Sequence, residues 1–124
     1  MGKTVAASFD TVADRLQQLL GARGFHLQFD IDLAEQLRQE AGARFPRYHI
    51  LGACHLRHMA RALAAEPQLG LLFPCHLIHY EDHTGQSVVL ARDPARIMDL
   101  LRHPVAIETA MLIRDELEAL LEEL

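Results

Sequence analysis

The stretch FHLQFDID, residues 25–32, decides the class of fold that the sequence predicts. Apolar and polar side chains alternate through it without a break, and a period of two is typical of a β-strand with one buried and one solvated face. The apolar residues are Phe25, Leu27, Phe29 and Ile31, and the polar ones are His26, Gln28, Asp30 and Asp32. We therefore predict a strand whose apolar set faces a core and whose polar set faces water.

Helical and strand patterns alternate on both sides of this strand. Upstream, a short apolar strand over 3–8 precedes a helix that Asp10 can cap and that Gly21 and Gly24 end. The remaining predicted elements are a helix over 33–40, a strand over 47–53, a helix over 55–65, strands over 70–80 and 86–91, a helix over 95–101 and a long helix after His103-Pro104. The predicted order is β-α-β-α-β-α-β-β-α-α.

This order predicts an α+β protein, a single two-layer domain over residues 1–124 with a mixed five-stranded sheet and helices against it. Turn residues over 81–85 predict that the strands over 70–80 and 86–91 form a hairpin. A right-handed crossover would make the strands over 47–53 and 70–80 parallel neighbours. The crossover helix carries an apolar stripe that we expect to be buried, formed by Leu56, Met59, Ala60 and Leu63.

Composition narrows the class of protein. Half of the 124 residues are hydrophobic and 23% are charged, as in one globular domain with a core of its own. The formal net charge of −5 offers no basic surface, so nucleic acid is not expected as a partner. No apolar run approaches the ~20 residues that cross a bilayer, so no membrane is expected either. Two cysteines are too few for a disulfide framework and favour a cytoplasmic location.

Two copies of the letters Cys-His-Leu-x-His, at 54–58 and 75–79, suggest a metal site. Zinc and copper accept thiolate and imidazole ligands. Strand alternation places Cys75 and His79 on one side of the sheet and His76 on the other, so that one ion could collect only part of the set. The candidate ligands are Cys54, His55, Cys75, His76 and His79.

Cys54 is the residue that the sequence favours most for chemistry. It is predicted at or near the start of the helix over 55–65, where unpaired amides and the helix dipole lower the pKa of a thiol, and where His55 and Arg57 add positive charge. Cys75 lies in an apolar strand, where a buried thiol is inert. If the strands are adjacent, the two cysteines could form a dithiol, carry a persulfide or bind a soft metal. Alternatively, both are small core hydrophobes.

Tyr48 and Tyr80 lie in neighbouring predicted strands and are candidates for lining a ligand cavity beside the cysteines. A small enzyme with a pocket near Tyr48, Cys54 and Cys75 is therefore an alternative, with histidines as acid or base. No phosphate-binding glycine loop, nucleophile elbow or dinucleotide motif is present. A binding role is thus favoured over a catalytic one.

Several motifs occur together along the chain. They are Phe45-Pro46-x-Tyr48-x-Ile50-Leu51-Gly52-Ala53-Cys54, Gly70-Leu71-Leu72-x-Pro74-Cys75, Tyr80-Glu81-Asp82, the early SFDTVADRLQQLLGARGF and the later DPARIMDLL. In these, over nearly its whole length, the chain resembles the DUF302 family. The resemblance implies a compact α+β domain with a mixed sheet and a tendency to self-associate, and it implies no particular activity. The family pattern has cysteines at the positions of Cys54 and Cys75, typically followed by Asn, where this chain has His55 and His76.

The sequence thus predicts a small cytoplasmic binding or carrier protein that uses Cys54, with Cys75 as a second thiol, for thiol, sulfur or soft-ligand chemistry. The alternatives are a transition-metal binder that holds Zn or Cu through the cysteines and nearby histidines, and the small enzyme described above. Apolar helix stripes and edge strands favour a homodimer. The expected ligand is a small molecule or a metal ion.

Overall fold

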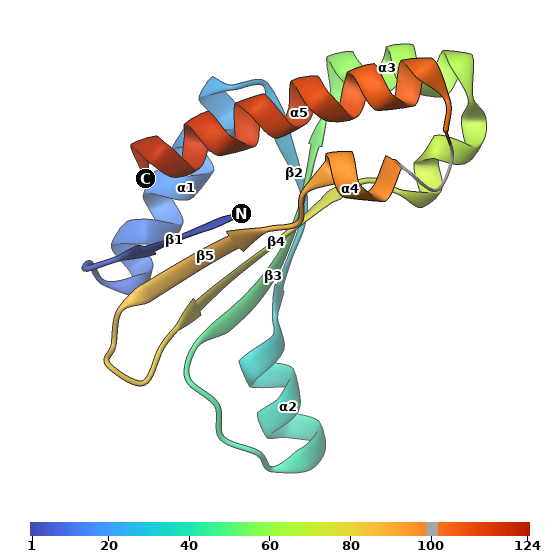
Figure 1. Ribbon diagram of the computed structural model, residues 1–124. Coiled ribbons are helices and arrows are strands. Elements are labelled where there is room, and N and C mark those ends of the chain that lie inside the picture. The colour runs from blue at the N-terminus through green and yellow to red at the C-terminus, as the bar shows by residue number, and fades with distance from the viewer. Residues whose placement is uncertain (99–101) are drawn as a thin grey trace.

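The structure is a computed structural model that describes residues 1–98 and 102–124 (Figure 1). Its strands are β1 (Gly2–Val5), β2 (Phe25–Asp32), β3 (Tyr48–His55), β4 (Cys75–Glu81) and β5 (Ser87–Ala91). Its helices are α1 (Phe9–Ala22), α2 (Leu33–Ala41), α3 (Leu56–Ala65), α4 (Pro94–Met98) and α5 (Pro104–Glu123), with a 3-10 helix over Pro67–Leu71. The predicted α+β class and order of elements are confirmed. Residues 99–101 of the predicted helix over 95–101 lie outside the described residues.

All five strands form one antiparallel sheet in the order β1-β5-β4-β3-β2. The predicted hairpin of β4 and β5 is confirmed, whereas the expectation of a mixed sheet with β3 and β4 parallel is wrong. Cys75, where β4 begins, pairs with Ala53 near the end of β3. The segment between these strands therefore leaves and re-enters the sheet at the same end, and it never crosses the sheet as a parallel connection must.

β4 is shorter than predicted, because the first part of the predicted strand over 70–80 packs as a turn. Pro67 opens the 3-10 helix, where its fixed φ suits a first helical position. Leu69 is fully buried and packs with small residues of α3 and α5 in a second core cluster. Part of the apolar run that resembles a central strand thus forms this turn and packs against α3 and α5.

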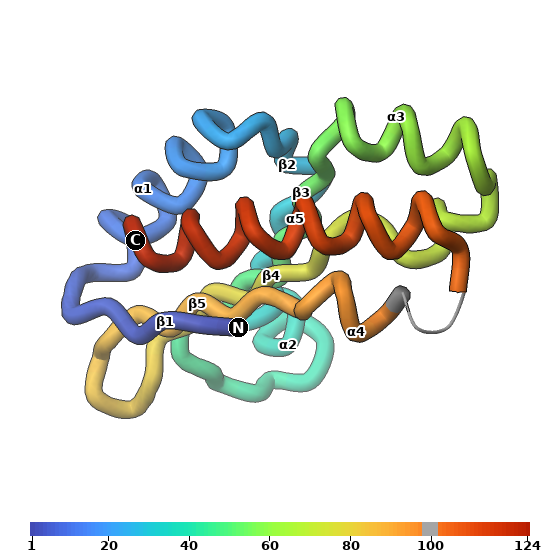
Figure 2. The backbone as a smooth tube through the Cα atoms, turned by 45° about the horizontal axis from the view of Figure 1, so that its top comes forward, coloured from blue at the N-terminus to red at the C-terminus, as the bar shows by residue number. Residues whose placement is uncertain are grey.

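The helices α1 and α5 cover one face of the sheet (Figure 1). Figure 2 shows α5 running along this layer, with α1 beside its C-terminal half and α3 beside its N-terminal half, while α2 lies apart from the layer. The core between helices and sheet consists of Val12, Leu16, Leu20, Phe25, Leu51, Ala53, Cys75, Leu77, Val89, Ala91, Ile113, Leu117, Leu120, Leu121 and Leu124. We call the other side of the sheet the open face. None of the described helices is long and apolar enough to cross a membrane.

A β-bulge divides the alternating stretch that predicts β2. Up to Leu27 the strand alternates as expected, but the register of its pairing with β3 then shifts. From there the two aspartates, Asp30 and Asp32, take the helix-covered side of the sheet, because an inserted residue reverses the facing of all that follow. The prediction that Phe29 and Ile31 face the core is therefore wrong, since both lie on the open face.

α3 buries a different stripe from the predicted one. Its buried residues are Met59 and Ala62, whereas Leu56 and Leu63 are 47% and 38% exposed and Ala60 is exposed as well. Ala62 packs with small residues of α5, and small side chains allow two helices to approach closely. α3 therefore turns Ala62 toward α5, and most of the predicted apolar stripe faces solvent.

Candidate functional site

The two cysteines lie on neighbouring strands but on opposite faces of the sheet. Cys75 pairs with Ala53 and faces the helices, and Cys54 is the next residue after Ala53, so its side chain points to the open face. Both thiols are free and buried. The strands are adjacent, as the sequence predicts, yet the pleat of the sheet directs the two side chains apart. The predicted dithiol pair is therefore not assembled.

The predicted activation of Cys54 is the reverse of what the structure shows. His55 caps α3, with its Nδ1 accepting a hydrogen bond from the His58 backbone N–H at 3.4 Å. Cys54 lies one residue earlier, within β3, and is 8% exposed. Burial raises the pKa of its thiol, which opposes formation of a thiolate. Burial, and then the nearby Cys54, raise the pKa of Cys75 to about 12.

The candidate metal ligands are dispersed over the molecule. Cys75 and His79 share the helix-covered face, as strand alternation predicts, and His76 lies exposed on the open face beside Phe29. His55 is used to cap α3. In the part of the chain that the structure describes, no group of three or more His, Cys, Asp or Glu side chains is placed to hold an ion. The Zn or Cu site expected from the sequence finds no support in these residues.

Tyr48 and Tyr80 pair across β3 and β4 on the open face, and their rings stack with centroids 5.4 Å apart. The best-formed cavities among the described residues are lined by neither tyrosine, and by neither Cys54 nor Cys75. The pocket predicted at these residues is therefore not among them.

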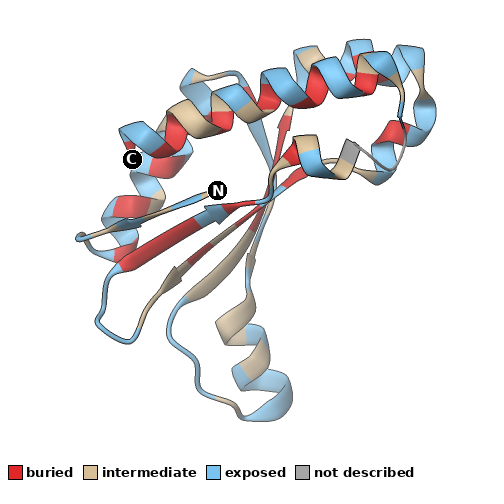
Figure 3. Ribbon diagram, viewed as in Figure 1, coloured by how far each residue is buried: buried red, intermediate tan, exposed pale blue. Residues whose placement is uncertain are grey.

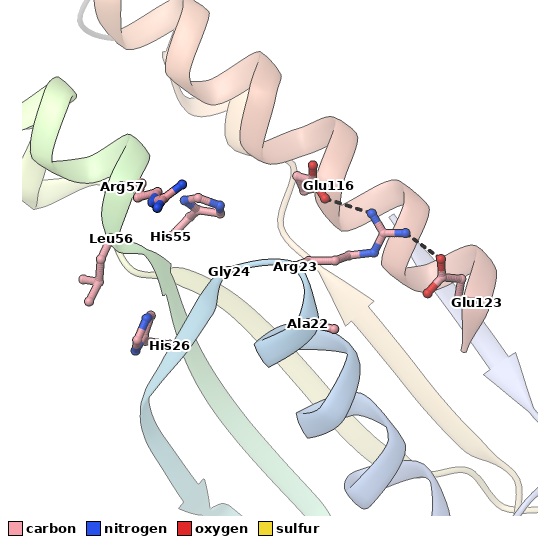
Figure 4. A pocket seen from close by; sticks show the side chains of 9 residues that line it. All are labelled: Ala22, Arg23, Gly24, His26, His55, Leu56, Arg57, Glu116 and Glu123. Carbon is pink, nitrogen blue, oxygen red and sulfur yellow. Dashed lines mark hydrogen bonds and ion pairs between the residues drawn. The ribbon is translucent and has the colours of Figure 1, made fainter.

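A wide cavity of about 670 Å³ lies where α1 ends and α3 begins (Figure 4). Arg23 reaches across it from the residue after α1 and donates hydrogen bonds to Glu116 at 2.8 Å and to Glu123 at 2.6 Å, both on α5. The two carboxylates raise the pKa of Arg23 further above its usual range. This network ties the end of α1 to α5 and pairs three charged groups of the cavity wall with one another; Arg57, which also lines the cavity, takes no part in it.

His55 forms another part of the wall of this wide cavity. Gly24 has φ +83° and lies so close to His55 that a Cβ at this glycine would be 2.7 Å from the imidazole Nε2. Burial, and then the nearby His58, lower the pKa of His55 and favour the neutral ring. Only a neutral ring can accept the capping hydrogen bond of α3 through Nδ1. We therefore interpret this cavity as a structural junction between α1, α3 and α5.

A second cavity, of about 230 Å³, opens between α1 and the helix-covered side of β2, β3 and β4, and we call it the α1 cavity. Its lining residues are the apolar Phe9, Ala13, Leu16, Leu20, Leu27 and Leu51 and the polar Asp14, Gln17, Asp30, Arg47, His49 and His79. The bulge in β2 brings Asp30 to this side, where its Oδ1 lies 2.6 Å from His49 Nδ1. Asp32 lies 3.7 Å from the other ring nitrogen. Two carboxylates of one strand thus hold the histidine of the next.

Phe9, the first residue of α1, joins the polar groups of the α1 cavity. Its ring stacks on His79 with centroids 3.8 Å apart and planes inclined by 4°. The Arg47 guanidinium lies 4.0 Å from the centroid of the same ring and donates a hydrogen bond to Asp10 at 2.8 Å. Stacking and the cation–π contact both favour this arrangement, so Phe9 fixes the positions of an imidazole and a guanidinium at the cavity.

His79 is the most buried polar group of the α1 cavity, at 1% exposure. Its Nε2 lies 3.3 Å from Ser87 Oγ. Burial, followed by the nearby His49 and Arg47, lowers the pKa of His79 to about 4. The imidazole is therefore neutral at neutral pH, and a neutral imidazole offers one hydrogen-bond donor and one acceptor.

Sequence reasoning missed most of this site. His79 is among the predicted metal ligands, but Phe9, Arg47 and His49 are not among the candidates. One signal is present in the sequence, because Arg47 and His49 are two residues apart in a predicted strand and so share a face. The bulge that turns Asp30 to the same side cannot be predicted from the alternating pattern of residues 25–32, which continues through it without interruption.

Fold and site together define a small α+β domain with one antiparallel sheet, helices packed on one face, and a cavity with a polar rim beneath α1. The model of the family DUF302, a domain of unknown function, matches residues 1–124, and the chain belongs to this family. The chain is also similar to the crystal structure of an uncharacterized conserved DUF302 protein from Bacillus stearothermophilus, at 26% sequence identity and a TM-score of 0.88, over 98% of this chain and 94% of that one. No curated protein matches the chain.

Proposed function

We propose that this protein binds a small molecule in the α1 cavity. An apolar cavity of about 150 Å³ is large enough for benzene. The α1 cavity, at about 230 Å³, therefore has room for one ring or branched chain with a short polar substituent. The observation that carries the proposal is the apolar lining combined with a few convergent polar groups, a combination typical of ligand pockets.

The neutral state of its one fully buried polar side chain, His79, supports this role. His79 is neutral at neutral pH, so a ligand can form a hydrogen bond beside it without an unpaired charge being buried. Leu16 and Leu20 project into the cavity from α1, one helical turn apart, and Leu51 projects from β3. These three leucines are at most 7% exposed, whereas Leu27, which also lines the cavity, is 37% exposed. Covering Leu27 with an apolar ligand group is favourable by about 25 cal/mol per Å² of apolar surface removed from water.

Ala13→Leu is expected to abolish ligand binding while the fold stays intact. Ala13 lines the α1 cavity and is only partly buried, so the added methyl groups occupy the cavity instead of an already packed core. We expect a set of single-ring fragments, followed by protein-observed NMR, to shift the signals of Leu51 and His79 in the wild type and not in this variant. Gln18→Leu, at an exposed position of the same helix, is the matched control and should bind as the wild type does. Equal binding by the wild type and Ala13→Leu, or binding by neither, would count against the proposal.

We further propose that two copies associate through the open face. The residues that the strand register places on this face are Gly2, Thr4, His26, Phe29, Ile31, Tyr48, Ile50, Gly52, Cys54, His76, Ile78, Tyr80, Val88 and Leu90. None of these is Asp, Glu, Lys or Arg, and the charged Arg92, whose backbone N–H bonds to His76, borders them at the end of β5. The centre of the same patch on two copies can therefore meet without repulsion between like charges, as a two-fold interface requires. The central strands carry both buried and partly exposed residues (Figure 3), and Ile50 and Ile78 are partly exposed whereas Leu77 is fully buried. Contiguous apolar surface of this kind is typical of protein interaction sites.

Ile78→Glu is expected to convert such a dimer into monomers, because it places a charge opposite its own copy at the middle of the open face. Sedimentation velocity over a range of protein concentrations measures the change, and circular dichroism checks that the variant is folded. Leu71→Glu is the control, since Leu71 is 86% exposed and lies outside the sheet. A wild type that stays monomeric throughout, or equal dissociation by both variants, would contradict the interface.

Three properties stay predictions from the sequence. They are thiol chemistry at Cys54 and Cys75, binding of Zn or Cu, and a cytoplasmic location.

A further inference from the structure

Arg47 and His49 stand side by side at the rim of the α1 cavity. They are two residues apart in extended chain, so they project from the same face. The carbonyl of Arg47 accepts a hydrogen bond from the Glu81 backbone N–H at 3.0 Å, which continues the pairing of β3 with β4 beyond Tyr48. Both ring nitrogens of His49 face aspartates, Nδ1 at 2.6 Å from Asp30 and Nε2 at 3.7 Å from Asp32. The guanidinium of Arg47 is therefore the group at this rim that can meet the two oxygens of a carboxylate.

The guanidinium of Arg47 has donors left for a ligand. Arginine carries five N–H groups, and the hydrogen bond from Arg47 to Asp10 uses Nη1. The two side chains of this ion pair are 47% and 79% exposed, and a pair so exposed contributes little to stability. A carboxylate at the rim can therefore share the guanidinium with Asp10, or take it over, at small cost.

Two carboxylates also line the α1 cavity, and they oppose an anion. Asp30 is bound to His49 Nδ1, and Asp14 is exposed on α1. Asp30 is already bound by His49 and the charge of the exposed Asp14 is screened by solvent, whereas Arg47 keeps unused N–H groups at the rim of the cavity.

We propose that the ligand of the α1 cavity is a small carboxylic acid with one ring or a branched apolar chain, bound as its carboxylate by Arg47. This assignment rests on the proposed function and names the class of ligand. The carboxylate lies at the rim, and the apolar part lies against Leu16, Leu20 and Leu51.

Three probes of similar size and different charge test the assignment on the full chain: benzoate, benzyl alcohol and benzylamine. Titrations followed by NMR are expected to shift the signals of residues lining the α1 cavity, with benzoate binding at least about tenfold more tightly than either of the others. Arg47→Gln should weaken benzoate about tenfold and leave benzyl alcohol unchanged. Arg44→Gln is the matched control, because Arg44 is exposed and does not line the cavity, and it should leave all three affinities unchanged.

The outcomes separate the assignment from the proposed function. Shifts at the cavity with benzylamine or benzyl alcohol binding as tightly as benzoate would overturn the carboxylate assignment while supporting a small-molecule site. Absence of shifts at the cavity with all three probes would overturn both. Equal weakening of benzoate by Arg47→Gln and Arg44→Gln would show a general effect of charge and overturn the role of Arg47.

Discussion

Replacement of Phe9 by alanine is expected to lower the free energy of unfolding by about 3–5 kcal/mol. The ring is 4% exposed, stacks on His79 and lies under the guanidinium of Arg47. Its removal deletes apolar burial, an aromatic pair and a cation–π contact at once, and it leaves a buried imidazole without the surface that covers it. Urea denaturation followed by circular dichroism measures the loss.

Two further variants show whether the loss comes from packing at the cavity. Phe9→Leu retains most of the apolar volume and is expected to retain most of the stability. Phe45→Ala removes the same ring from a position that is 57% exposed, and it should change the free energy of unfolding by less than about 0.5 kcal/mol. A loss in Phe9→Ala no larger than that in Phe45→Ala would contradict the packing described for α1 on the sheet.

The alternating stretch over 25–32 shows which features of a strand can be predicted from sequence and which cannot. Alternation is sufficient to predict a strand, and the strand is confirmed with the predicted bounds. It is insufficient to predict which side each residue faces, because a single bulge reverses the facing without interrupting the pattern. The reversal brings Asp30 and Asp32 to His49, a partner distant in the sequence, and such a contact has no local signature.

The repeated sequence Cys-His-Leu-x-His at 54–58 and 75–79 shows one prediction that strand alternation makes correctly and one that depends on an exact helix boundary. Strand alternation correctly predicts that Cys75 and His79 face one way and His76 the other. The state of Cys54 depends instead on a shift of one residue, since β3 runs on through His55 and that histidine takes the capping position. A one-residue change in a helix boundary therefore replaces an activated thiol by a buried one, and helix boundaries are less certain than the helices themselves.

The direction of β4 relative to β3 is predicted wrongly from the sequence for a different physical reason. A helix between two adjacent strands usually indicates a parallel crossover, and this rule predicts β3 and β4 parallel. Here α3 packs Ala62 on α5, and the 3-10 helix anchored by Leu69 turns the chain back to the end of the sheet that it left. The deciding contacts are between Ala62 and residues more than forty positions later, Ala106 and Ala110, so no pattern within the connection reveals them.

His79 is expected to make the protein about 3 kcal/mol less stable at pH 4 than at pH 7. In the folded chain its pKa is lowered to about 4 by burial and by His49 and Arg47, against a weaker opposite effect of Asp30, whereas its ordinary value is 6.5. Between these values the unfolded chain binds the proton and the folded chain does not, so stability falls as the pH falls through this window. Above 6.5 the imidazole is neutral in both states, and its contribution to the pH dependence vanishes.

His79→Gln isolates this contribution, because an amide can hold a hydrogen bond to Ser87 without titrating. Urea unfolding at a series of pH values should show that the variant loses less stability than the wild type between pH 7 and pH 4, by up to about 3 kcal/mol. His83→Gln, at an exposed turn between β4 and β5, should retain the wild-type dependence. Parallel curves for the wild type and His79→Gln would assign the acid sensitivity to other groups, of which His55 is the first to test, because burial lowers its pKa in the same direction. A flatter curve for His79→Gln alone would establish that the imidazole on Phe9 is neutral in the folded protein, which is the state in which the α1 cavity can hold a ligand beside it.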